Sequence, residues 1–202
     1  MAEDIRQPSL LSRLFRKALV SIYHHNGWTA FGEVPSPRKF VLIAAPHTSN
    51  WDFLNFIGLT DDLGITPHFM AKKSLFRWPW KNFMLDMGGV PVDRSGNQNY
   101  VQAMIDEFAN RTEFMLTIAP EGTRGAVRKW KTGFYHIAIG AKVPIVLGFM
   151  DYARKVGGLG PMMWPTGVFS EDMKEMARFY SGVTARFPEK ASDYRSMIGD
   201  EG

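Results

Sequence analysis

A histidine and an aspartate stand five positions apart in "APHTSNWDF", residues 45–53. A neutral imidazole held by a carboxylate accepts a proton near pH 7 and is stabilised once it is charged. His47 and Asp52 could therefore act as a general base and its orienting acid. The same letters also fit a helix start, because "SNWD" is a Ser-x-x-Asp capping pattern that ends at Asp52. Taken alone, the stretch leaves both interpretations open.

The spacing restricts where the two side chains can meet. On one α-helix, residues five apart are rotated by roughly 140°, at ~100° per residue, so they cannot share a helix face. His47 must instead lie on a turn, with Asp52 in the first turn of the helix that follows. The flanking residues predict this arrangement. "FVLIAA" (40–45) is typical of a strand buried on both faces, and "WDFLNFIGL" (51–59) of a short helix.

The rest of the chain alternates in the same way. Strands are expected at 40–45, 67–71, 89–92, 113–119 and 143–150. Helices are expected at 8–25, 51–59, 73–87 with a break at Pro79, 99–110, 132–142, and from a Ser170 cap to Gly182. Residues 157–167 suggest a loop or irregular hairpin, and the last residues a loose tail. This alternation predicts a single α/β domain, with a mostly parallel central sheet flanked by helices and an N-terminal amphipathic helix.

The N-terminal segment, residues 8–25, places leucines at helical spacing and basic residues such as Arg13 and Lys17 between them. Two interpretations remain open. The helix could pack on its own domain, or it could lie in a membrane interface with its basic groups facing anionic headgroups. Because Gly27 ends the segment, we divide the chain into this helix (1–27) and one larger domain (28–202).

Composition excludes several kinds of chemistry. The 202 residues include no cysteine, which rules out disulfides, thiolate metal sites and cysteine nucleophiles. The net charge of +4 suits a phosphate-bearing partner or an anionic membrane surface, while the absence of a long basic block disfavours nucleic acid. No apolar stretch reaches the ~18 residues of a membrane span, and no signal peptide is evident. We expect a cytoplasmic protein that can lie on a membrane.

Polar residues follow the ends of the first four expected strands: His47, then Lys72 and Lys73, then Asp93 and Arg94, then Glu121 and Arg124. The carboxyl ends of parallel strands share one edge of a sheet, where ligands bind, so these side chains should gather at one crevice. In "APEGTRG" (119–125), glycines allow a tight turn that exposes backbone N–H groups beside a guanidinium. Such a turn could receive a phosphate.

Together these pieces resemble the glycerolipid acyltransferases, the family that includes 1-acylglycerol-3-phosphate acyltransferase. "HTSNWD" resembles the H-x4-D motif of that family. "GGVPVDR" (88–94), "PEGTRG" (120–125) and "VPIV" (143–146) are similar to its next three blocks, and "AKKSLF" (71–76) to the segment between the first two. The order and spacing agree over residues 40–150. Several departures leave the acceptor open: Gly125 replaces the usual serine, Leu147–Gly148 replace a second proline, and Trp51 and the run "RWPW" (77–80) are less typical.

The resemblance implies direct acyl transfer from acyl-CoA or an acyl carrier protein to a hydroxyl, with no metal or other cofactor. His47 and Asp52 would be the catalytic pair, and Arg94 would hold the phosphate of the acceptor. The remaining residues that the resemblance assigns to the acceptor site are Lys72, Glu121, Gly122, Thr123 and Arg124. The acceptor would be a lysophospholipid, above all 1-acylglycerol-3-phosphate, and the enzyme would lie on the inner face of the cell membrane.

Three alternatives remain. The acceptor could be another lipid hydroxyl, such as a lyso-ornithine lipid. The protein could be a lipid-ester hydrolase with Ser49 as nucleophile, although no Gly-x-Ser-x-Gly elbow surrounds that serine. It could also be a non-enzymatic basic module that binds membrane or nucleic acid, which consumption of a thioester would exclude.

Overall fold

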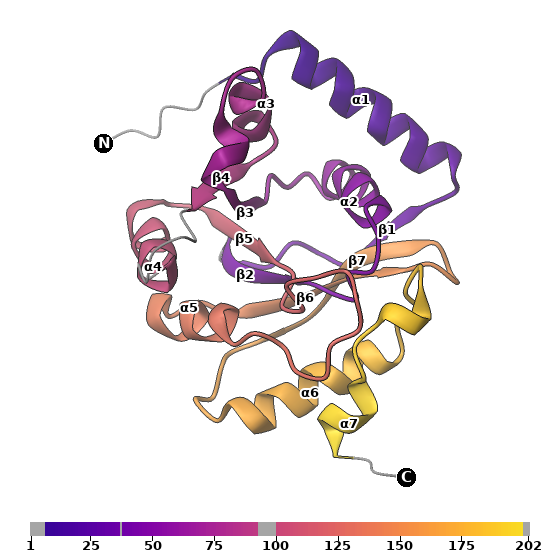
Figure 1. Cartoon of the computed structure of the whole chain (residues 1–202), viewed down its shortest axis with the longest axis vertical. Coiled ribbons are helices and arrows are strands. Elements are labelled where there is room, and N and C mark those ends of the chain that lie inside the picture. The colour runs from indigo at the N-terminus through magenta and orange to yellow at the C-terminus, as the bar shows by residue number, and fades with distance from the viewer. Residues whose placement is uncertain (1–6, 37, 93–99, 200–202) are drawn as a thin grey trace.

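A computed structural model describes residues 7–36, 38–92 and 100–199. Over these residues the chain forms one seven-stranded sheet (Figure 1). The strands are β1 (Thr29–Phe31), β2 (Lys39–Ala44), β3 (His68–Lys72), β4 (Gly89–Val92), β5 (Phe114–Ile118), β6 (Ile145–Asp151) and β7 (Val156–Met163), in the spatial order β1-β7-β6-β2-β5-β3-β4. β2 to β6 are mutually parallel, and only the β6–β7 pair is antiparallel. The expected α/β class with a mostly parallel sheet is confirmed.

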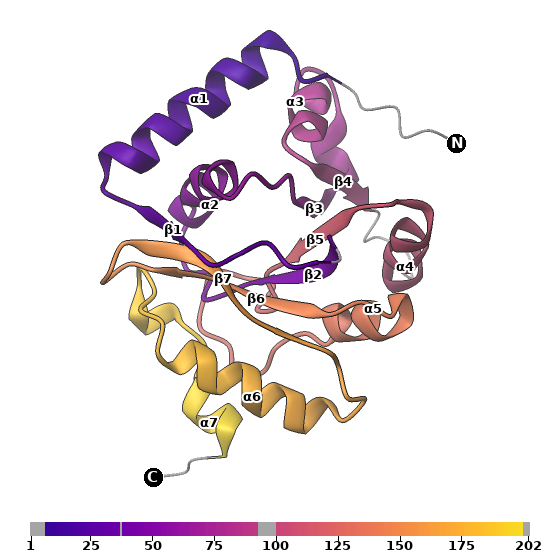
Figure 2. The same ribbon diagram turned by 180° about the vertical axis from the view of Figure 1, so that it is seen from behind.

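Helices cover both faces of this sheet (Figures 1 and 2). They are α1 (Leu10–His25), α2 (Trp51–Asp62), α3 (Lys81–Asp86), α4 (Tyr100–Asn110), α5 (Gly133–Ala141), α6 (Phe169–Ser181) and α7 (Tyr194–Ile198), with short 3₁₀ turns η1 (Lys73–Phe76) and η2 (Pro188–Lys190). α1, α2 and α3 lie on one side of the sheet, and α4 to α7 lie on the other. The break expected at Pro79 falls between η1 and α3.

Central strand β2 shows why the run "FVLIAA" carries no polar position. Phe40 and Leu42 belong to a buried cluster on the α2 side of the sheet. Val41 and Ile43 belong to the larger cluster formed with the helices of the other side. Because successive side chains of a strand point to opposite faces, a strand covered on both faces must be apolar throughout.

Residues 157–167, predicted to be a loop or irregular hairpin, instead contribute most of strand β7. The glycines that suggested a loop permit close approach of backbones. A Cβ on Gly158 would lie 2.3 Å from the carbonyl oxygen of Phe31, and one on Gly160 would lie 2.8 Å from that of Leu147. Glycine within a strand marks such contacts as well as turns. β1, which pairs with β7, was not predicted because three residues are too short to show a period.

The C-terminal segment also differs from its prediction. The expected loose tail contains η2 and α7, and Tyr194 is buried against Trp130 and Tyr180. Ser170 does not cap α6, which begins at Phe169. The segment before this helix is tied to its first turn by Asp172, whose carboxylate accepts bonds from the Thr166 N–H and hydroxyl. The expected helix end at Gly182 is confirmed.

Helix α1 packs on α2 through a close contact between Tyr23 and Gly58. Tyr23 is buried, and a Cβ on Gly58 would lie 2.2 Å from its ring. The Tyr23 ring also stacks on the Trp28 ring, with their centroids 6.2 Å apart. Gly58 therefore allows the tyrosine ring to lie directly on the α2 backbone, and this contact holds the N-terminal helix against the domain.

We predict that Gly58→Ala lowers the free energy of unfolding by about 1–3 kcal/mol, because the added methyl overpacks the α1–α2 contact. Urea unfolding measures the effect. Gly182→Ala is the matched control, since a Cβ there meets only the Phe179 carbonyl oxygen at an ordinary 3.6 Å. Equal stability of the two variants would contradict the prediction.

Candidate active site

The candidate site lies at the carboxyl end of the parallel strands. His47 follows the central strand β2, and Glu121 and Arg124 follow its neighbour β5. Tyr152 follows β6, the neighbour of β2 on the other side. Three adjacent strands thus deliver polar side chains to one edge, as the parallel arrangement requires.

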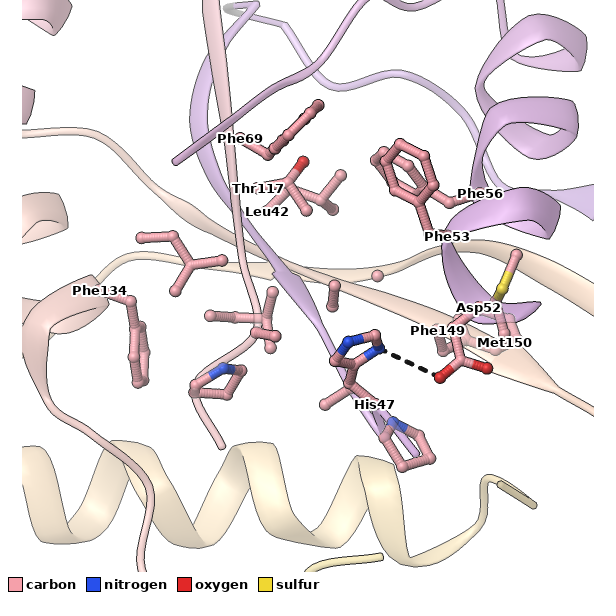
Figure 3. Close-up of a pocket in the computed structure, with 18 of the residues that line it drawn as sticks. Leu42, His47, Asp52, Phe53, Phe56, Phe69, Thr117, Phe134, Phe149 and Met150 are labelled. Carbon is pink, nitrogen blue, oxygen red and sulfur yellow. Dashed lines mark hydrogen bonds and ion pairs between the residues drawn. The ribbon is translucent and has the colours of Figure 1, made fainter. Parts of the chain in front are cut away.

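The turn after β2 brings His47 and Asp52 together (Figure 3). Because α2 begins at Trp51, Asp52 lies in its first turn, and His47 Nδ1 is 3.1 Å from Asp52 Oδ2. The same oxygen accepts the backbone N–H groups of Thr48 and Ser49, both at 2.9 Å. Ser49 Oγ in turn accepts the Trp51 N–H at 3.1 Å. The paired interpretation is therefore correct. The capping interpretation is correct only in part, because Ser49 and Asp52 bind backbone N–H groups of this turn while the N-cap of α2 is Asn50, which makes no side-chain capping bond.

Hydrogen bonding keeps the buried Asp52 carboxylate charged. Burial by itself would raise its pKa, but the hydrogen bonds from His47, Tyr152 and the Ser49 N–H more than offset this effect, and the pKa of Asp52 is lowered. A carboxylate can only accept, so the proton of a neutral His47 lies on Nδ1. This tautomer leaves Nε2 as a free acceptor, which is the form a general base needs.

His47 and Asp52 line a cavity of about 1040 Å³ that is bounded mainly by apolar side chains. Phe53 and Phe56 of α2 lie on one side of it, and Leu42 and Phe69 come from the sheet (Figure 3). The volume lies at the upper end of the range for ligand pockets, and apolar walls with a few polar groups are typical of such sites. The cavity can therefore take a long apolar group whose polar end lies beside the imidazole.

Glu121 supports the turn from behind. It is 4% exposed, accepts the His47 backbone N–H on Oε2 at 2.9 Å, and accepts the Ser192 hydroxyl on Oε1 at 3.3 Å. Ser192 also accepts the Trp130 indole N–H at 3.1 Å. Burial raises the pKa of Glu121 to about 7. Its carboxylate contacts the backbone of the His47 turn, and it is not part of the cavity lining.

The other predicted site residues fall into two groups. Gly122, Thr123 and Arg124 line the cavity, and the Arg124 guanidinium donates to the Asn50 side chain. Gly122 has φ +67°, a conformation that favours glycine. Arg94 lies outside the residues that the structure describes, as does the side chain of Lys72, whose backbone ends β3.

Three further side chains at the site were not predicted from the sequence: Tyr152, Ser192 and Lys131. Lys131 lines the cavity beside Gly122. Tyr152 donates to Asp52 Oδ1 at 2.7 Å, and it follows a strand end as the other site residues do. Polar residues were noted after the ends of the first four expected strands, and the same observation after the fifth, at 143–150, would have found Tyr152. Ser192 carries no comparable signal, because its segment has no clear period.

Within the part of the chain that the structure describes, no group of three or more metal-binding side chains is arranged to hold a metal ion. Over the same ranges, no helix combines the length and the hydropathy needed to cross a bilayer.

An α/β sheet with a histidine–carboxylate pair at its carboxyl edge, opening on an apolar cavity, defines an enzyme site for a substrate with a long apolar group. The sequence profile of the Acyltransferase family matches residues 31–147, more than half of the chain, and the chain belongs to that family. The fold is similar to the crystal structure of the 1-acyl-sn-glycerophosphate (LPA) acyltransferase PlsC from Thermotoga maritima. The TM-score is 0.55 and the sequences are 21% identical, over 84% of this chain and 76% of that one. No curated protein sequence matches.

The buried Glu121 carboxyl predicts a pH-dependent stability. Its pKa is raised from 4.5 to about 7, so the folded protein binds this proton more tightly than the unfolded chain. The resulting stabilisation is fully present below the unfolded value and is lost as the pH rises through the folded one. Between about pH 4.5 and pH 8, we expect the wild type to lose on the order of 3 kcal/mol of unfolding free energy relative to Glu121→Gln.

Urea unfolding of both proteins across this pH range measures the difference. Glutamine keeps the shape and the acceptor oxygen but does not titrate, so it isolates the ionisation of Glu121. Stability curves that run parallel over the whole range would contradict the raised pKa.

Proposed function

We propose that this acyltransferase moves a fatty acyl group from an acyl thioester to the hydroxyl of a lysophospholipid, with 1-acylglycerol-3-phosphate as the preferred acceptor. The observation that carries the proposal is the His47–Asp52 pair, 3.1 Å apart, on the wall of a large and mainly apolar cavity. The similarity of fold to PlsC from Thermotoga maritima supports the choice of acceptor class.

In the proposed reaction, His47 Nε2 takes the proton of the acceptor hydroxyl as that oxygen attacks the thioester carbonyl carbon. Asp52 holds the imidazole through Nδ1 and stabilises its charged form. The tetrahedral intermediate then expels the thiolate, which receives the proton from the imidazolium. The products are an ester and a free thiol, and no acyl-enzyme is formed.

The lining of the cavity supports a fatty acyl chain as the transferred group. Each methylene buried against its apolar walls contributes about 0.8 kcal/mol, so a long chain gains considerable binding energy there. Arg124 and Lys131 are exposed residues of the same lining and suit the phosphate of the acceptor. We assign Arg94 to that phosphate as well, on the resemblance alone. Acyl-CoA and acyl carrier protein remain equal candidates for the donor.

The hydrolase alternative is poorly supported. Ser49 is buried, its Oγ accepts the Trp51 N–H, and it is not part of the cavity lining. A nucleophile must reach the carbonyl carbon of its substrate, and this hydroxyl is buried and bonded to the Trp51 N–H instead.

We also propose that the enzyme lies on the inner face of the cell membrane through α1. Leu10, Leu11 and Leu14 on this helix are 66%, 76% and 56% exposed, with Arg13 and Lys17 among them. Exposed leucines with interspersed basic residues suit an interfacial helix on an anionic membrane. Helix α3 contacts α1 through Phe83, whose ring packs on Phe15. The segment just before α3 adds Trp78, whose side chain is 91% exposed.

His47→Ala should lower the rate of acyl transfer by at least ~10²-fold while the protein stays folded, because it removes the general base. The assay supplies an acyl thioester and a panel of lysolipids, including lyso-ornithine lipid, and follows free-thiol release and product mass. His136→Ala, at an exposed histidine of α5, is the control and should keep full activity. A folded His47→Ala protein with the wild-type rate would refute the proposed mechanism.

The double substitution Leu11→Asp with Leu14→Asp should release the protein from vesicles that contain anionic phospholipid, because carboxylates oppose both apolar insertion and headgroup attraction. Cosedimentation with these vesicles measures the bound fraction. Ile139→Asp is the control, since this exposed isoleucine lies on α5, across the sheet from α1 (Figure 2). Unchanged binding of the double variant would remove α1 from the membrane contact.

A further inference from the structure

Tyr152 binds the oxygen of Asp52 that His47 does not use. Its hydroxyl donates to Asp52 Oδ1 at 2.7 Å, while Oδ2 accepts the His47 ring N–H and two backbone N–H groups. Tyr152 stands just past the end of β6, one hundred residues after Asp52 and outside the part of the chain that the family profile matches. Both oxygens of the carboxylate are therefore occupied, one by the turn and one by a distant segment.

The Tyr152 hydroxyl is itself held in one orientation. The Asn55 side-chain amide donates to its oxygen at 3.3 Å, so the hydroxyl proton is left to point at Asp52. The ring packs edge-on against Trp28, with centroids 4.9 Å apart and an interplanar angle of 86°. The Arg186 guanidinium lies over the ring at 5.7 Å from its centroid. A tyrosine held in this way at its hydroxyl by Asn55 and at its ring by Trp28 and Arg186 adds rigidity as well as one hydrogen bond.

We propose that Tyr152 is a positioning residue for acyl transfer, which acts by fixing the plane of the Asp52 carboxylate and through it the His47 imidazole. The torsion that rotates a carboxylate is broad and poorly restricted, so contacts to both oxygens are needed to hold the plane. Tyr152 is not part of the cavity lining, and its hydroxyl points at Asp52, so it does not touch the reacting atoms.

The same bond also affects the charge of the site. It is one of the hydrogen bonds that hold the pKa of Asp52 down against its burial. Without the tyrosine hydroxyl, Oδ1 would lose its donor in a side chain that is only 9% exposed. An unpaired carboxylate oxygen at a buried position is costly, and the carboxylate can relieve the cost by turning away from His47.

The first experiment compares Tyr152→Phe with the wild type in the acyl-transfer assay, and so it rests on the proposed function. We expect kcat to fall on the order of 10-fold, with the KM values for thioester and acceptor unchanged, because the geometry of the base is altered and the substrate contacts are not. Asn55→Ala should lower kcat in the same direction by a smaller factor, since it releases the tyrosine hydroxyl.

Tyr135→Phe is the matched control. The Tyr135 hydroxyl donates to the buried Asp172 at 2.6 Å, so this substitution also removes a tyrosine–aspartate bond, but one away from His47. We expect it to lower thermal stability and leave kcat unchanged. A fall in kcat of equal size in both tyrosine variants would show a general structural effect and overturn the proposal.

A second measurement does not depend on turnover. The ring N–H proton of His47, bonded to a carboxylate, gives a downfield resonance in proton NMR, which Tyr152→Phe should shift and Tyr135→Phe should not. If the wild type transfers acyl groups and Tyr152→Phe matches it in both kcat and this resonance, the positioning role is refuted. If the wild type itself transfers no acyl group to any lysolipid, the proposed function fails instead.

Discussion

The geometry of the site depends on the Asp52 carboxylate and the four hydrogen bonds that it accepts. Thr48 and Ser49 bind it through their backbone, His47 through its ring and Tyr152 through its hydroxyl. One carboxylate therefore closes the turn after β2, starts α2, sets the tautomer of the imidazole and connects to the end of β6. Because it lies in the first turn of a helix, the positive end of the helix dipole also favours its charge.

Much of the fold was predictable from sequence because the parallel strands are buried on both faces. Apolar runs such as 40–45 and 143–150 are easily recognised, and helix α4 between them has a clear apolar period. β7 was missed because its glycines, which allow Phe31 and neighbouring backbones to approach, are the residues that also mark loops. The ordered C-terminal segment was missed because it is held by tertiary contacts of Trp130 and Tyr194, and no local pattern reports these.

The site was predictable where it follows strand ends. The positions of His47, Glu121 and Arg124 follow from the parallel topology, since each comes directly after a strand. The burial of Glu121 behind the His47 turn could not be anticipated, because it depends on Ser192 and on the path of a segment 71 residues further along the chain. The order of strands and polar residues places these side chains along the edge, but it does not determine which of them face the cavity and which support the turn.

The stacking of α1 on α2 has a consequence for how a lipid would travel. α2 carries Asp52 at its start and contributes Phe53 and Phe56 to the cavity, while Tyr23 of α1 rests on its outer side at Gly58. If the exposed leucines of α1 lie in the headgroup region, the two stacked helices, each ~10 Å in diameter, separate the cavity from the bilayer surface. To move between membrane and cavity, an acyl chain then has to pass this double layer of helices.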